Sequence, residues 1–284
     1  MTQGPIAGAE PHEGIGDAPD LSVPRWSNRN DTEPWYDSFP WWMIIIALVV
    51  GWMAYLVVFD PQYNLAFDRI IPGIWVTIRA TLWTFFIACV LGMIVALGRT
   101  SRNVVARNLA RSYVEFIRGI PILVLIFTLA LVVVPMVFGW FGADNRLSSE
   151  WRGIAALSLI YGGYIAEIFR AGIQAVDKGQ VEAGRSLGLT RRQTTRSIVL
   201  PQAVRAVVPP LGNDFIAVLK DTSLLSVLGV YELTLNARQY SAGSFKFRES
   251  YLALSFIYLT LTILLSLLLG VIERRMHRDR KGAR

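Results

Sequence analysis

Six long apolar runs constrain the fold of this chain more than any other feature. They cover residues 41–59, 73–98, 119–141, 153–169, roughly 206–230 and 251–272. At ~1.5 Å rise per residue, a helix of about twenty residues crosses a hydrocarbon core of ~30 Å, and even the shortest run can just do so. We therefore expect an all-α integral membrane protein with about six transmembrane helices.

The composition agrees with a bilayer as the surrounding medium. Of the residues, 53% are hydrophobic and only 17% are charged, which is unusual for a soluble domain. The net charge of +7 could suit nucleic acid, but the basic residues lie between apolar runs, as in cytoplasmic loops of membrane proteins. We expect no nucleic-acid partner. Cys89 is the one cysteine and lies in an apolar run, which excludes a disulfide and a thiolate metal site.

The distribution of arginine and lysine predicts the orientation. Basic residues concentrate in 99–118, in 173–205 and after Ile272, whereas 60–72 and 142–152 carry one and two arginines. The basic segments should be cytoplasmic. An even number of spans then places the N-terminus in the cytoplasm as well as the C-terminus.

Three regions follow from this organisation. Residues 1–39 contain five prolines, seven acidic residues and few apolar ones, which predicts a disordered cytoplasmic tail rather than a signal peptide. Residues 40–272 form the transmembrane domain, and residues 273–284 form a basic cytoplasmic tail.

The segment 173–205 interrupts the apolar pattern with a basic hairpin. Asp177 and Gln180 are spaced like a helix start, and Gly188 stands where a helix would end in a left-handed turn. Thr190 and Gln193 repeat the start signal. We expect a second helix that runs to Leu200 and ends before Pro201, a residue that disfavours helix at the position before it.

Two interpretations of this hairpin are open from its residues alone. An amphipathic hairpin rich in arginine could lie on anionic lipid. Alternatively, it could dock a soluble partner, because the small residues Ala183 and Gly184 allow close approach.

The spacing in this hairpin resembles the EAA loop of permease subunits of ABC transporters of the importer type. The positions that carry the resemblance are Glu182, Ala183, Gly184, Gly188, Ile198, Leu200 and Pro201. Gly184 is the only departure among them, because alanine is common there in the family. In that family the loop contains a coupling helix that sits in a cleft of a cytoplasmic ATPase subunit. The resemblance implies ATPase coupling by Glu182, Ala183, Gly184, Arg185, Ser186, Gly188 and Thr190.

Three further stretches narrow the resemblance to permeases for polar amino acids. They contain Tyr113, Glu115, Phe116, Arg118, Gly119 and Pro121; Glu167, Arg170 and Gly172; and Asn213 with Lys220, Asp221, Thr222, Ser223 and Leu224. The resemblance covers about residues 70–272 and implies a five-span core, so the first span is an N-terminal addition.

No G-x-x-x-x-G-K-[ST] phosphate loop occurs in the sequence, so ATP and Mg should be bound by a separate ATPase chain. The family resemblance implies three partners: cytoplasmic ATPase subunits, a second permease subunit that is identical or homologous, and an extracytoplasmic amino-acid-binding protein. It also implies that the protein lies in the bacterial inner membrane. We expect no covalent catalysis, no metal and no cofactor in this chain.

Charged groups at membrane depth are candidates for the substrate path. Arg79 lies in the outer half of the second run, and its planar guanidinium could pair with a substrate carboxylate. It could instead extend to the interface or pair with an acid such as Asp68.

A second polar group interrupts the fifth run. Lys220, Asp221, Thr222 and Ser223, with Asn213 before them, could form a pocket wall or hinge. Lys220 and Asp221 could instead pair only to fix helix packing. Pro209 and Pro210 should break the helix in this run.

An ion-gradient-driven secondary transporter is the main alternative function. It predicts inverted repeats and intramembrane carboxylates for ion coupling, but the sequence shows no repeat and the hairpin would lack a role. A membrane-embedded enzyme would need a cluster of histidine, cysteine or carboxylate side chains near the membrane surface, which the sequence does not contain.

Overall fold

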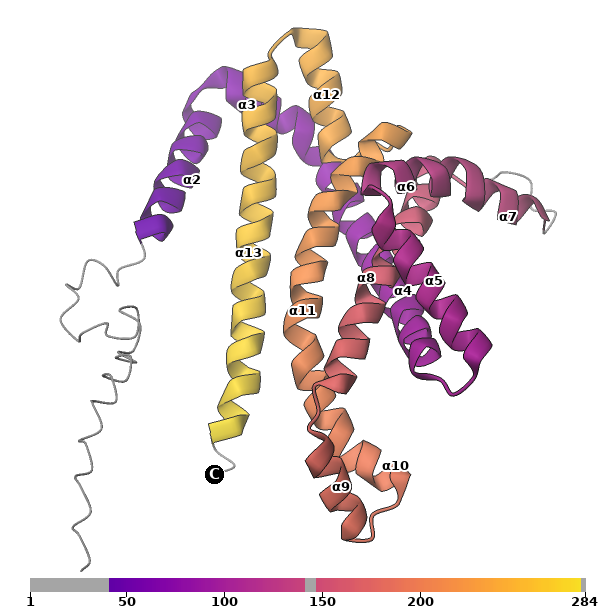
Figure 1. The fold of residues 1–284 in the computed structure, drawn as a ribbon. Helices are drawn as coiled ribbons and strands as arrows, with labels where there is room; N and C mark the ends of the chain where they lie inside the picture. The colour runs from indigo at the N-terminus through magenta and orange to yellow at the C-terminus, as the bar shows by residue number, and fades with distance from the viewer. Residues whose placement is uncertain (1–40, 141–146, 282–284) are drawn as a thin grey trace, which may run out of the picture. The chain divides into compact units, whose positions relative to one another are not determined.

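The computed structural model describes residues 41–140 and 147–281, and their regular structure is entirely helical. The predicted tail of residues 1–39 lies outside the described residues. The α-helices are α2 (Trp41–Phe59), α3 (Pro61–Ile70), α4 (Ile74–Thr100), α5 (Val104–Gly119), α6 (Ile122–Thr128), α7 (Val134–Trp140), α8 (Ser149–Gln174), α9 (Lys178–Ser186), α10 (Arg191–Thr194), α11 (Leu200–Asp221), α12 (Leu233–Ser244) and α13 (Phe247–Lys281) (Figure 1). Short 3₁₀ segments are η2 (Ile71–Gly73) and η5 (Thr222–Leu228), and π segments are η3 (Leu129–Val133) and η4 (Thr195–Val199). Residues 1–47 form a unit separate from residues 48–284, and the packing below is that of the second unit.

Five of the six expected spans coincide with helices long and apolar enough to cross a membrane. These helical segments are Trp41–Phe59, Pro61–Thr100, Ile122–Trp140, Ser149–Gln174 and Phe247–Arg275. The prediction of an all-α membrane protein is confirmed. The sixth span, expected at 206–230, is not confirmed, because α11, which covers most of that run, is not among these segments.

A row of small residues lets α4 and α8 pack closely. Ala80, Thr84, Ala88, Gly92 and Ala96 recur every four residues along α4, and all are buried. A Cβ on Gly92 would lie 2.8 Å from Ile165 Cγ2 and 3.0 Å from the backbone nitrogen of Ala166. Small residues at such a crossing allow backbones to approach, which is how helices associate in lipid. The α4–α8 pair is therefore the centre of the fold.

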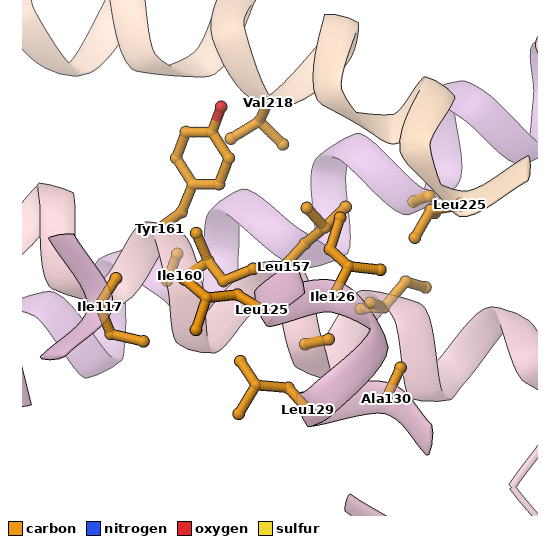
Figure 2. Packing of buried hydrophobic residues seen from close by; sticks show 14 of the residues in the cluster. Ile117, Leu125, Ile126, Leu129, Ala130, Leu157, Ile160, Tyr161, Val218 and Leu225 are labelled. Atoms are coloured by element: carbon orange, nitrogen blue, oxygen red, sulfur yellow. The ribbon is translucent and has the colours of Figure 1, made fainter. Parts of the chain in front are cut away.

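The main core surrounds this pair. Figure 2 shows Leu157 and Ile160 of α8 close to Leu125 of α6, with Val218 of α11 nearby. Leu125, Leu157 and Ile160 have no exposed surface. The side chains of α5, α6 and α11 thus pack on the α4–α8 pair from different sides.

A second core joins the start of the second span to the C-terminal helices. Ile70 of α3, Leu233 of α12 and Ile257 of α13 belong to one buried cluster. Gly73 allows this contact, since a Cβ there would lie 2.6 Å from the backbone of Glu232 and of Leu233. The tight approach fixes the turn before α12 against the beginning of α4.

The expected break at Pro209 and Pro210 is wrong. Both prolines lie inside the continuous helix α11. Each removes a backbone donor, but Val207 is buried against α8 at Gly172, and Gly212 faces Leu269 of α13. Packing on two sides holds the helical path where local preference alone would end it.

Candidate functional site: the basic hairpin and the polar groups of the spans

The hairpin predicted from the sequence is present. Helix α9 begins after Asp177, whose carboxylate accepts a hydrogen bond from the backbone N–H of Gly179 at 2.7 Å. Helix α10 begins with a complete capping box: Gln193 N–H donates to Thr190 Oγ1 at 3.3 Å, and Thr190 N–H donates to Gln193 Oε1 at 2.9 Å. Both helix starts are confirmed.

The turn between the helices requires glycine. Gly188 has φ +83°, in the left-handed region that side chains with a Cβ disfavour. Its N–H donates to Arg185 O at 3.0 Å, and Leu189 N–H donates to Gly184 O at 3.2 Å. These two bonds form a Schellman motif, which satisfies the last carbonyls of α9.

Gly184 packs against the second half of the hairpin. It is buried, and a Cβ there would lie 2.6 Å from Ile198 Cδ1, the end of a side chain that would have to shift to admit it. The hairpin is also tied to α11, because Gln202 Nε2 donates to Gln180 Oε1 at 2.6 Å. The hairpin is thus internally packed rather than a loose loop.

The second hairpin helix does not end at Leu200 as expected. Helix α10 continues through the π segment η4 directly into α11, with Pro201 in the first turn of α11. A proline ring clashes with the carbonyl four residues earlier, and the wider π turn just before it makes room. Helical backbone therefore connects the hairpin to α11 without a loop.

One face of the hairpin helix α9 is exposed. Glu182, Ala183, Arg185 and Ser186 are exposed, and Leu187 is 84% exposed. Arg191, Arg192, Thr195, Arg196 and Leu200 line a basic groove beside it. A surface with an exposed leucine next to exposed arginines has the chemistry of a protein contact.

Arg79 lies near the N-terminal end of α4 and is already paired. Its Nε and Nη2 donate to Glu150 Oε1 and Oε2 at 2.9 and 2.6 Å. The bidentate partner is therefore Glu150 in the first turn of α8, not Asp68. The Arg79 side chain remains 41% exposed, so it is accessible as well as paired.

The segment from Lys220 to Ser223 changes the helix type. Helix α11 ends at Asp221, and η5 begins at Thr222. Tyr161 OH of α8 donates to Asp221 Oδ2 at 2.8 Å, and Thr222 Oγ1 donates to Leu219 O at 2.7 Å. The change from α-helix to 3₁₀ helix falls within this polar segment. Asp221 forms its hydrogen bond with Tyr161, whereas Lys220 is exposed and forms no ion pair with it among the described residues.

The other polar groups of α11 lie before this segment. Asn213 is exposed, whereas the Oδ2 atom of Asp214 is buried and has no hydrogen-bond partner among the described residues. A groove between α11, α4 and α13 is lined only by apolar residues, among them Phe215 and Leu269. That groove offers no partner for a zwitterion.

The hairpin residues thus form one surface, but the candidate path residues do not form one cluster. Arg79 belongs to α4, and Asn213 and Lys220–Ser223 belong to α11 and η5. No hydrogen bond or ion pair within residues 41–140 and 147–281 joins Arg79 to that group. Substrate binding by these residues stays a prediction.

The sequence interpretation overlooked two acidic groups. Glu150 lies in the first turn of α8, whose N-cap is Ser148, and no local pattern identified it as the partner of Arg79. Glu232 is fully buried and caps α12, accepting from the N–H groups of Thr234 and Leu235 at 2.9 and 2.8 Å. Burial raises the pKa of Glu232, although these hydrogen bonds act in the opposite direction.

The last turn of α4 and the C-terminal part of α8 carry a third ionic group. Glu167 binds both Arg170 and Arg99. The ion pair within α8 is thus extended by Arg99 to a second helix.

Comparisons with known proteins place these features in a family. Residues 88–278 match the family described as "Binding-protein-dependent transport system inner membrane component". The chain is 37% identical over 202 residues to the glutamine transport system permease protein GlnP of Escherichia coli K12, covering 70% of this chain and 90% of that one. It is 40% identical over 208 residues to the L-cystine transport system permease protein TcyB of Bacillus subtilis, covering 72% and 86%.

A solved structure is also similar to this chain. It is a crystal structure of an amino acid ABC transporter with histidines, 36% identical, with a TM-score of 0.66 over 75% of this chain and 95% of that one. The match extends over nearly the whole length of that solved chain.

Proposed function

Since the chain belongs to the family of inner membrane components of binding-protein-dependent transport systems, and is an ABC importer permease of the polar amino-acid type, we propose that it forms the translocation path for polar amino acids and is driven by ATP hydrolysis in a separate subunit. It is a multi-pass protein of the inner membrane. The amino-acid transport named for its relatives supports the substrate class.

The hairpin α9–α10 is the observation that carries the coupling role. It is exposed, internally packed and joined by continuous helix to α11. Such a rigid projection can transmit force from a soluble partner to the spans, whereas a loose loop could not. The proposed partner is a cytoplasmic ATPase that binds ATP and Mg and receives α9 in a cleft.

The remaining partners follow from the same proposal. A second permease subunit, identical or homologous, completes the path, and an extracytoplasmic binding protein delivers the amino acid. Closure of the ATPases would move the hairpins together and rock the spans between two access states. Arg79, Asn213 and Lys220–Ser223 are the proposed polar groups of the path.

Purification with the ATPase co-expressed tests this function. We expect a stoichiometric ATPase partner, and ATP hydrolysis in proteoliposomes that rises when the binding protein loaded with a polar amino acid is added. Glu182→Arg should abolish retention of the ATPase, because it reverses charge on the exposed face of α9. Glu273→Arg near the end of α13 is the matched control and should retain it.

The alternative, a secondary transporter, gives a different outcome in the same vesicles. Uptake would follow an imposed proton or sodium gradient, would proceed without ATP and would not respond to Glu182→Arg. That result would refute the proposed function.

A further inference from the structure

Glu167 is the centre of a charged network at the cytoplasmic ends of α4 and α8. Its Oε2 accepts from Arg99 Nη1 in the last turn of α4 and from Arg170 Nε, the latter at 3.1 Å. Its Oε1 accepts from Arg170 Nη2. One carboxylate therefore binds two guanidinium groups from two helices, in a site where the Arg99 side chain is only 12% exposed.

The network continues toward the hairpin. Arg170 Nη1 donates to Gln174 Oε1, and Gln174 is the last residue of α8. Asp177, the cap of α9, follows three residues later. A line of polar contacts thus runs from the end of α4 through Glu167 to the point where α8 passes into the hairpin.

The same two helices are also joined at their other ends by the Arg79–Glu150 pair. Arg79 and Arg99 are twenty residues apart on α4, which corresponds to ~30 Å at ~1.5 Å per residue and equals the thickness of a hydrocarbon core. Between the two ion pairs, the small residues of α4 pack directly on α8. The α4–α8 pair is therefore fastened at both ends and along its length, as a single rigid body would be.

These contacts suggest how a movement of α9 reaches the spans. We infer that Glu167 is a positioning residue for coupling: it holds the end of α8, and hence α9, to α4, so that displacement of the hairpin moves α4 and α8 together. This inference rests on the proposed function, in which the ATPase displaces α9. Without Glu167, α9 and the end of α8 could move while the end of α4 stays in place, although the two helices remain packed on each other elsewhere.

Removing the charge of Glu167 should uncouple amino-acid transport from ATP hydrolysis, without stopping the hydrolysis. In Glu167→Gln, two arginines remain close to each other without a carboxylate, so repulsion should separate the end of α4 from α8. The hairpin surface is unchanged, so the ATPase should still bind. We expect hydrolysis to continue while the number of amino acids transported per ATP falls at least fivefold.

The transport-to-hydrolysis ratio in proteoliposomes is the measurement, since a role limited to general stability would lower both rates together. Glu273→Gln is the matched control, because Glu273 also lies near the cytoplasmic end of a spanning helix and has no ion pair among the described residues. Its ratio should equal that of the wild type. An unchanged ratio in Glu167→Gln would overturn the inference.

A charge-inverted variant tests the same contact without deleting it. Arg99→Glu, Glu167→Arg and Arg170→Glu in one chain restore one central charge between two opposite ones. This variant should recover at least half of the wild-type ratio. Failure to recover, in a variant that inserts and binds the ATPase, would also count against the inference.

A third test remains valid if Glu167→Gln fails to insert. In a Cys89→Ser background, Arg99→Cys and Glu167→Cys are joined by a short bifunctional thiol reagent. Joining them should raise the transport-to-hydrolysis ratio above that of the same variant without the reagent, because α4 and α8 need to move together. If the link instead blocks transport, the inference is overturned. Absence of any ATPase partner from the wild-type complex would instead refute the proposed function itself.

Discussion

Gly188 shows how strongly one backbone angle can determine the docking surface. At φ +83°, a residue with a Cβ costs ~1–2 kcal/mol and a β-branched one more. Gly188→Val should therefore distort the hairpin turn and reduce ATP-driven transport in proteoliposomes at least tenfold, with normal insertion into the membrane. Gly243→Val, at an open helical position, should transport normally. Wild-type transport by Gly188→Val would show that the hairpin is not the coupling element.

The pairing of Arg79 with Glu150 makes the prediction for the substrate path more specific. A partly exposed pair contributes only ~0–1 kcal/mol to stability, so Arg79→Met should insert and bind the ATPase normally. We expect it to lower amino-acid transport at least tenfold, while hydrolysis without substrate persists. Arg79→Lys should be intermediate, because an ammonium keeps the charge but loses the two-pronged geometry. The measurement is uptake of a labelled amino acid alongside ATPase activity.

Glu150→Gln separates the two roles of Arg79. It removes the ion pair but leaves the guanidinium available to a substrate carboxylate. If Glu150→Gln loses as much transport as Arg79→Met, and the double variant loses no more, the pair is structural and Arg79 does not bind substrate.

Residue roles that depend on near neighbours in sequence could be predicted, and those that depend on distant ones could not. The left-handed turn at Gly188 and the capping box of Thr190 and Gln193 follow from local hydrogen bonding. The Arg79–Glu150 contact joins residues 71 positions apart. No local pattern distinguishes Glu150 from Asp68 as a partner, because the choice is made by the packing of α4 on α8.

At the scale of elements, the close crossing of α4 and α8 makes its own prediction. Gly92→Val would place two methyl groups against Ile165 and the Ala166 backbone, where even a Cβ lies within 3.0 Å of a backbone atom. Overpacking of this kind costs ~1–3 kcal/mol. We expect a lower thermal unfolding midpoint in detergent, whereas Gly51→Val, with open space around it, should unfold like the wild type. If Gly92→Val and the wild type had equal unfolding midpoints, the packing of α4 on α8 would be looser than described.

The elements also show where sequence patterns stop being sufficient. Five apolar runs became helices near their expected positions, because lipid demands internally satisfied backbone and leaves few alternatives. Two predictions based on proline were wrong: the helix end before Pro201 and the helix break at Pro209–Pro210. In both places a neighbouring π turn or helix keeps the chain helical, and neither is visible in the local sequence.

At the scale of the whole molecule, the arrangement of α11 and α13 places the hairpin and the end of α13 on the same side. The apolar groove between them aligns Val208 and Ile216 of α11 with the stretch Leu265–Ile272 of α13. Figure 1 shows the hairpin α9–α10 and the end of α13 at one end of this unit, with the connection between α12 and α13 at the other. The positive charges of the hairpin and of Arg274 and Arg275 thus belong to the same side.

That arrangement yields a prediction of topology. In a Cys89→Ser background, single cysteines are placed at Ala242 in α12, at Arg107 in α5 and at Gln193 in the hairpin, all exposed. Because the arginine-rich side should be cytoplasmic, a membrane-impermeant maleimide added to intact spheroplasts should label only Ala242→Cys. Arg107→Cys and Gln193→Cys should react only after the membrane is permeabilised, which also serves as the control that each cysteine is reactive. Labelling of Gln193→Cys in intact spheroplasts would place the hairpin outside the cell, where no ATPase could reach α9. Such a result would remove the coupling role of the hairpin, and the movement assigned to α4 and α8 with it.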